Sequence, residues 1–137
     1  MIKKIINNTL KHLKPLFNFI VKKEGVDGID YPKVVFHTKI QDCDECLLTK
    51  TAYFDPNTNK IHLFVCDNMG TISCKSICRS FAHECIHYIQ EFRGDIAKSG
   101  YSGDKITEDD NLIKLEEESF LKCNMLFRSY TELLNKD

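Results

Sequence analysis

Residues 81–90 constrain this chain most, because they carry the pattern His-Glu-x-x-His. Residues four apart on an α-helix lie one above the other on the same face, so His83 and His87 can direct both imidazoles at one point. Glu84 projects about 100° away from His83 around the helix axis, which puts its carboxylate beside that point. Two neutral imidazoles next to a carboxylate suit a zinc ion with a general base beside it. We therefore predict His83 and His87 as metal ligands and Glu84 as a catalytic base.

The residues around the motif fit a helix over 73–92 that has one buried side. Ser73 is a good N-cap, and Gly94 is placed to end the helix. A helix with a separate apolar stripe packs that side on a core and presents its histidines to a cleft. This arrangement favours a metal site over a surface helix with two chance histidines. The stripe consists of Cys74, Ile77, Cys78, Phe81, Cys85 and Ile89.

Composition places the chain in an ordinary globular class. Its 137 residues suit one domain with a real core, and a net charge of −1 gives no global field that would select nucleic acid. Seven cysteines at irregular spacing do not read as a disulfide framework. We find no secretory signal and no apolar run long enough to cross a bilayer. The expected location is a cytoplasm, or a virus particle assembled in one.

Residues 1–24 are predicted to form a basic amphipathic helix. Apolar residues recur at helical spacing, with lysines and asparagines opposite them. Pro15 should break or kink this helix, or begin a second one after Lys14. Two interpretations remain: the apolar stripe packs on the domain core, or the segment touches a membrane or a partner.

The middle of the chain, residues 33–66, reads as a small sheet. Residues 33–40 are rich in β-branched and aromatic side chains, which predicts a strand. Residues 49–55 and 60–66 form a predicted hairpin around the turn at 56–59. A final helix is expected over residues 111–135 from its apolar periodicity.

A catalytic zinc site needs a third protein ligand and an open position. No histidine follows His87, so we expect an acid further along the chain. On the final helix Glu116 shares the inward apolar stripe, while Glu117 lies at its edge. Glu118 aligns instead with lysines on a solvent face. A carboxylate on an apolar stripe needs a partner, and a zinc ion is one. We predict Glu116 as the third ligand, with Glu117 next, against the interpretation that all three are ordinary surface glutamates.

The motif, with Glu116 and the small residue Ser119 on a later helix, resembles the gluzincin type of zincin metallopeptidase. The order of elements is also similar to compact phage-encoded members and to the peptidase domains of ImmA/IrrE-like proteins. The resemblance implies a single zincin-like α+β domain over residues 1–137. It would comprise an N-terminal helix, a small, mostly antiparallel sheet, the motif helix and a C-terminal helix that carries the third ligand. Phe120 departs from the family pattern, in which Asp or Asn at this place orients a histidine.

The resemblance implies zinc-dependent hydrolysis of a peptide or protein substrate. Glu84 would take a proton from a water bound to zinc and deliver it to the leaving amine. The substrate would lie extended along an edge strand, for which residues 49–55 are our choice. An additional oxyanion donor is usual, and nothing in the sequence selects among four candidates. These are Tyr88, Tyr101, Tyr130 and His62.

Other functions compete with this one. Cys43 and Cys46 form half of a second zinc site, although reduced thiols explain them more economically. The rival to an enzyme is a structural or binding protein, for example a virion component, that binds zinc without turnover. Nucleic-acid binding is not expected, because the N-terminal lysines lack arginines and interleaved aromatic side chains.

Overall fold

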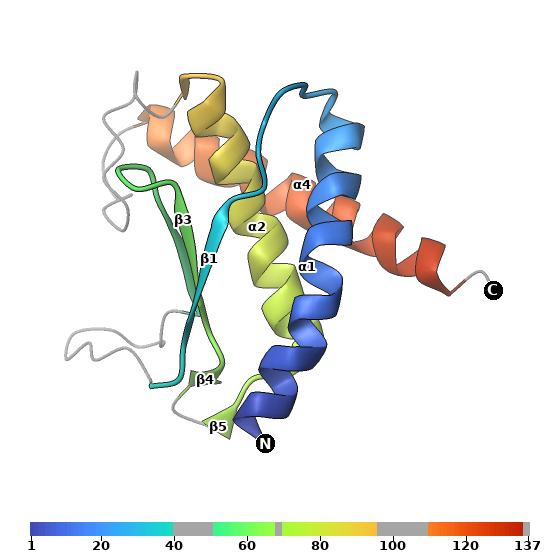
Figure 1. Cartoon of the computed structure of the whole chain (residues 1–137). Helices are drawn as coiled ribbons and strands as arrows, with labels where there is room; N and C mark the ends of the chain where they lie inside the picture. Colours follow the sequence, from blue (N-terminus) through green and yellow to red (C-terminus); the bar gives the residue numbers. More distant parts are fainter. Residues whose placement is uncertain (40–50, 68–69, 96–109, 136–137) are drawn as a thin grey trace.

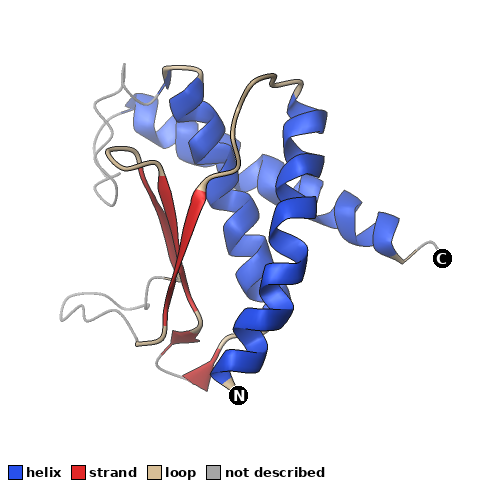
Figure 2. Cartoon of the chain, viewed as in Figure 1, coloured by secondary structure: helices blue, strands red, loops and turns tan. Residues whose placement is uncertain are grey.

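The computed structural model describes residues 1–39, 51–67, 70–95 and 110–135. Over these residues the chain is an α+β fold with three helices on one side of a small mixed sheet (Figures 1 and 2). The elements follow in the order α1 Ile2–Glu24, β1 Lys33–His37, β2 Ala52–Asp55, β3 Lys60–Phe64, β4 Cys66–Asp67, β5 Gly70–Thr71, α2 Cys74–Phe92 and α4 Asp110–Leu134.

The first helix, α1, runs through Pro15 and neither ends nor restarts there, which corrects the expectation of a second helix. An internal proline costs about 3 kcal/mol, but buried side chains before and after it pack α1 against α2 and α4. Gly25 ends the helix in the left-handed region at a φ of 66°, and its N–H bonds the carbonyl of Lys22. The buried side chains of α1 are Thr9, Leu13, Leu16, Phe17 and Ile20.

The three-stranded sheet has the order β1-β3-β2 and is mixed, not mostly antiparallel. β2 and β3 form the predicted hairpin, whose turn is held by Asp55 through hydrogen bonds from the Asn57 N–H and the Thr58 hydroxyl. β1 pairs with β3 in parallel, with Val35 opposite His62. Alternation in a sequence predicts a strand but not its direction, because both directions share a period of two. The pairing leaves β2 at an edge of the sheet.

The central element is α2, which lies between the sheet and the other two helices (Figure 1). Its first turn is capped by Ser73, whose Oγ accepts a hydrogen bond from the Ser76 N–H at 3.2 Å. Ile61 and Leu63 of β3 are fully buried in the core that β3 shares with α2, and His62 lies on the opposite face of the sheet. From residue 81 to residue 90, no position of α2 is exposed.

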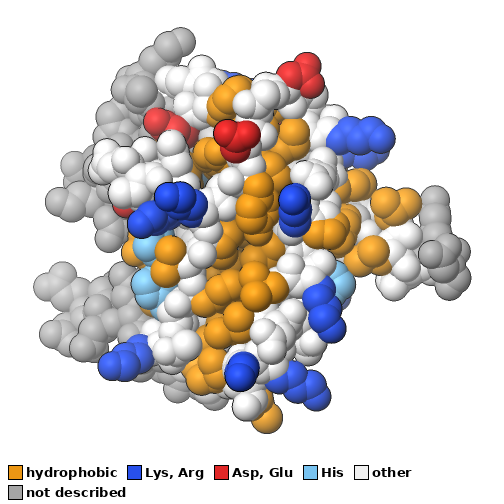
Figure 3. Space-filling view, viewed as in Figure 1, with side chains coloured by type: hydrophobic (Ala, Val, Ile, Leu, Met, Phe, Trp, Pro, Cys, Tyr) orange, Lys and Arg blue, Asp and Glu red, His pale blue; other side chains and the backbone are white. Residues whose placement is uncertain are grey.

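The lysines of α1 lie on its solvent side, and its buried side chains face the core. Figure 3 shows basic side chains beside a band of apolar ones that follows α1 and the adjoining elements. The buried apolar side chains of α1 pack on the core of the fold. That the lysine-bearing side of α1 contacts a partner stays a prediction. Within the described part of the chain, no helix has both the length and the apolar composition that a membrane crossing requires.

Candidate metal centre

The two histidines of the motif lie one turn apart on α2, on the side that meets α4. Their ring centroids are 5.0 Å apart. The side chain of His87 is 2% exposed and that of His83 is 19% exposed, so the pair spans the boundary between core and solvent. The spacing in the sequence therefore produces the convergence that the helical geometry requires.

The third group comes from α4. Glu116 Oε1 lies 2.6 Å from His83 Nε2, and Glu116 Oε2 lies 3.0 Å from His87 Nε2. One ligand atom from each of the three residues lies within 4.8 Å of the other two. Two imidazole nitrogens and a carboxylate are a ligand set of catalytic zinc sites. The three residues therefore offer the types of donor that such a metal site uses.

The two histidines hold the carboxylate of the cluster in its ionised form. Burial acts to raise the pKa of Glu116, but hydrogen bonds and charge interactions with His83 and His87 outweigh it and hold that pKa well below its usual range. Burial acts to lower the pKa of His87, and the Glu116 carboxylate raises it overall. The carboxylate is thus ionised at neutral pH, as a metal ligand must be.

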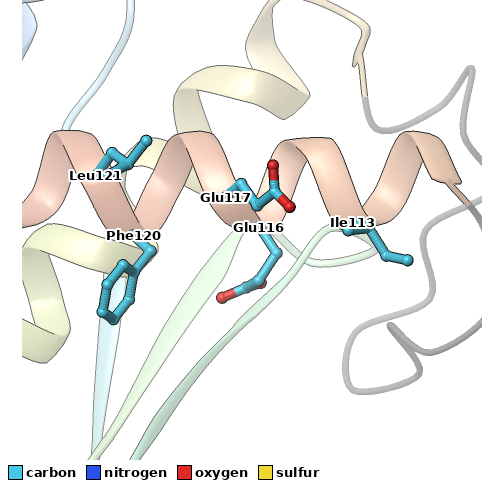
Figure 4. Close-up of a pocket in the computed structure, with 5 residues that line it drawn as sticks. All are labelled: Ile113, Glu116, Glu117, Phe120 and Leu121. Atoms are coloured by element: carbon cyan, nitrogen blue, oxygen red, sulfur yellow. The ribbon is translucent and has the colours of Figure 1, made fainter.

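Glu117 does not reach the two histidines, although the sequence left it as the next candidate. It lines a shallow pocket of about 430 Å³ beside Glu116, and in Figure 4 the two carboxylates point in different directions. The rest of the pocket lining is apolar and comes from Ile113, Phe120 and Leu121 of α4. A hydrophobic surface therefore adjoins the third ligand.

A hydrogen-bond network behind His87 was not predicted from the sequence. His87 Nδ1 lies 2.8 Å from Gln90 Oε1, and the Gln90 amide donates to the carbonyl of Leu115 and to Glu118 Oε1, both at 2.9 Å. Glu118, which we assigned to a solvent face, thus belongs to this network as well as pairing with Lys122 at 3.4 Å. The spacing of Gln90, three residues after His87 on one helix, was the available signal.

Ser119 and Phe120 take different positions on α4. Ser119 is fully buried, and its hydroxyl donates to the carbonyl of His83 at 2.6 Å. Phe120 is 60% exposed and lines the pocket near Glu116, so it does not hold a histidine. The orienting group that a family member would place at Phe120 is therefore absent from that position.

Glu84 lies on a third face of α2, toward the edge strand. Ser80, one turn before it, approaches Thr51 at 3.4 Å between hydroxyls, and Tyr88, one turn after it, packs on Phe54 of β2. Residues at this spacing share a face, so Glu84 is directed toward β2. It is 7% exposed. The carboxylate is therefore buried, and its charge acts to raise the pKa of His87 and of Cys123.

None of the described candidates for an oxyanion donor is joined to the triad. Tyr88 donates its hydroxyl to the carbonyl of Asp30 at 2.9 Å. Tyr130 packs against Phe19 of α1. His62 lies 2.8 Å from His37, nitrogen to nitrogen, on the far face of the sheet. The remaining candidate, Tyr101, lies outside the described residues.

The cysteines give no second metal cluster in the part of the chain that the structure describes. Cys43 and Cys46 lie outside it, and the cysteines inside it are free thiols. Burial raises the pKa of Cys78 to about 12 and that of Cys123 to about 11. These two thiols are therefore protonated, uncharged members of the core. His83, His87 and Glu116 form the one candidate cluster of at least three metal-ligating side chains found among the described residues.

Comparisons with known proteins give no match to a family model, to a curated protein or to a solved structure. The candidate site therefore rests on its own geometry and chemistry.

Proposed function

We propose that this protein is a zinc-dependent peptidase, with His83, His87 and Glu116 as the metal ligands and Glu84 as the general base. The observation that carries the proposal is the meeting of two Nε2 atoms from α2 with one carboxylate from α4. This arrangement needs a tertiary contact between two helices, so a chance repeat of histidines along one helix does not explain it.

Bound zinc would polarise the scissile carbonyl and lower the pKa of water to about 7. Glu84 would accept the proton of the attacking water on a carboxylate oxygen and pass it to the leaving amine. Its position on α2, next to His83 but directed toward β2, supports a role as base and not as ligand. The surrounding core limits the water that reaches this carboxylate.

The edge strand supports an extended peptide as substrate. In the described sheet β2 pairs only with β3, so its other edge offers backbone donors and acceptors to an added strand. Glu84 faces this strand from α2. The apolar pocket along Ile113, Phe120 and Leu121 supplies a surface for a side chain next to the metal ligands.

The burial of Glu84 favours one alternative, a zinc-binding structural protein without turnover. A base that is 7% exposed reaches water only when a cleft opens to it. The same three ligands would then hold zinc for stability alone.

A comparison of Glu84→Gln with wild type separates the two functions. Both proteins are loaded with zinc and incubated with a diverse peptide library, and Glu91→Gln on the same helix is the matched control. We expect cleavage by wild type and the control, with a loss of roughly 10²–10⁴-fold in Glu84→Gln from the acid–base contribution. Cleavage that survives Glu84→Gln undiminished would refute the mechanism. Equal inactivity of all three zinc-loaded proteins would favour the structural protein.

A further inference from the structure

Gln90 is fully buried, and its Oε1 lies 2.8 Å from Nδ1 of His87, the ring nitrogen that does not face Glu116. We infer that Gln90 is a positioning residue, which fixes the ring orientation and tautomer of His87 so that Nε2 is the metal donor. The inference rests on the proposed metal site. It assigns to a residue of the motif helix the task for which Phe120, 60% exposed, is unsuited.

The hydrogen-bond partners determine which way the Gln90 amide faces. The carbonyl of Leu115, 2.9 Å from Gln90 Nε2, can only accept a hydrogen bond. An amide rotated by half a turn would place Oε1 against this carbonyl, oxygen against oxygen. The NH₂ group therefore faces Leu115, where it also reaches Glu118 Oε1, and Oε1 faces His87.

The direction of the amide then determines the proton on the histidine. Gln90 Oε1 accepts and cannot donate, so His87 Nδ1, 2.8 Å away, carries the hydrogen. In a neutral imidazole with Nδ1–H, the lone pair is on Nε2. His87 Nε2 lies 3.0 Å from Glu116 Oε2, a hydrogen bond whose proton a bound metal ion would replace. One amide thus selects the nitrogen that faces the other two ligands.

Burial makes this contact hard to replace. Gln90 is fully buried and His87 is 1% exposed, so solvent offers no substitute acceptor for the Nδ1 proton. The NH₂ group of Gln90 donates to the Leu115 carbonyl and to Glu118, and Glu118 forms an ion pair with Lys122. Lys122 also pairs with Glu24 at the end of α1, at 2.7 Å. The ring orientation is therefore fixed by all three helices.

The test measures the zinc affinity and the His87 tautomer of Gln90→Leu. This substitution nearly keeps the size of the side chain and removes its polar atoms. Zinc affinity is measured by competition with a chromophoric chelator, and the His87 nitrogens are observed by long-range ¹H–¹⁵N NMR. We expect affinity to fall about 10–100-fold and the Nδ1–H signal of His87 to lose its protection from exchange.

The matched control is Thr9→Val, which removes another fully buried hydrogen-bonding group, remote from the site on α1. We expect it to lower the melting temperature without changing zinc affinity.

Wild-type zinc affinity together with an unchanged Nδ1–H signal in Gln90→Leu would overturn the inference and leave Gln90 as a packing residue. A wild-type protein that binds no zinc would overturn it together with the metal site. Zinc binding without peptide cleavage would refute only the peptidase, because neither readout here depends on turnover.

Discussion

We predict that the size of Ser119 limits how closely α4 approaches α2, and its substitution tests the helix contact that assembles the site. The residue is fully buried, its hydroxyl bonds the His83 carbonyl at 2.6 Å, and it lies one turn after Glu116. Two substitutions separate its hydrogen bond from its size. Ser119→Ala removes the hydroxyl alone, and Ser119→Val replaces it with two methyl groups.

The two substitutions differ in expected magnitude. Ser119→Ala loses one hydrogen bond, worth about 0.5–1.5 kcal/mol, and leaves the His83 carbonyl with its helical partner. Ser119→Val adds overpacking of about 1–3 kcal/mol at a contact with no free space. For a chain of this size, a change of 1 kcal/mol moves Tm by roughly 3–5 °C. We therefore expect Tm to fall by about 2–7 °C for Ser119→Ala and by about 5–20 °C for Ser119→Val.

The assay is thermal unfolding followed by circular dichroism, with zinc affinity measured on the same samples. Ser119→Ala should bind zinc like wild type, since Glu116 stays in place. Ser119→Val should bind more weakly, because the wider contact moves Glu116 away from both histidines. Equal Tm and equal affinity for the two variants would refute the claim that side-chain size at Ser119 sets the distance between the helices.

Three further outcomes follow from the same contacts. Zinc at 100 times its Kd should stabilise wild type and Glu117→Gln by about 2.7 kcal/mol, and Glu116→Gln should lose most of this gain in a thermal shift assay with chelator as the reference. Lys122→Met should lower the free energy of unfolding by about 1–3 kcal/mol, because it removes the closest partner of the mostly buried Glu24 carboxylate. Urea titrations at low and high salt measure this loss of stability, and a change within error of zero would contradict the prediction. Burial raises the pKa of Cys78 to about 12 from 9.0, so the folded thiol keeps its proton while the unfolded thiol ionises. The stability from this group is full below about pH 9 and declines as the pH rises toward 12; urea titrations with reductant at pH 8 and pH 10 should show a steeper loss for wild type than for Cys78→Ala.

The parts of the site that were predictable are those governed by the period of one helix. The four-residue spacing of His83 and His87 placed both rings on one side of α2, and the stripe on the last helix distinguished Glu116 from its neighbours. The hairpin was likewise predictable from its turn residues. These features depend on local geometry, which a sequence carries directly.

The parts that escaped prediction depend on contacts between elements. The parallel pairing of β1 with β3 follows from the path of the chain and not from the residues of either strand. Glu118 seemed a solvent residue because its helical neighbours are lysines, yet the amide of Gln90 reaches it from α2. Pro15 was expected to break or kink the helix or to begin a second one, because its local cost was weighed without the packing of Leu13 and Leu16 on either side of it.

The lack of an exposed position between residues 81 and 90 of α2 has a consequence for how this protein tolerates mutation. Positions that govern abundance are those that support the core, and positions that govern metal binding are those of the candidate metal centre. Here one ten-residue segment serves both, since Phe81 and Ile89 support the core while His83 and His87 belong to the candidate metal centre. A mutational scan scored only by growth or activity would show one uninterrupted intolerant block. Scoring cellular abundance alongside zinc occupancy would divide the block, with substitutions at His83 abolishing zinc occupancy but lowering abundance less than substitutions at Phe81 do.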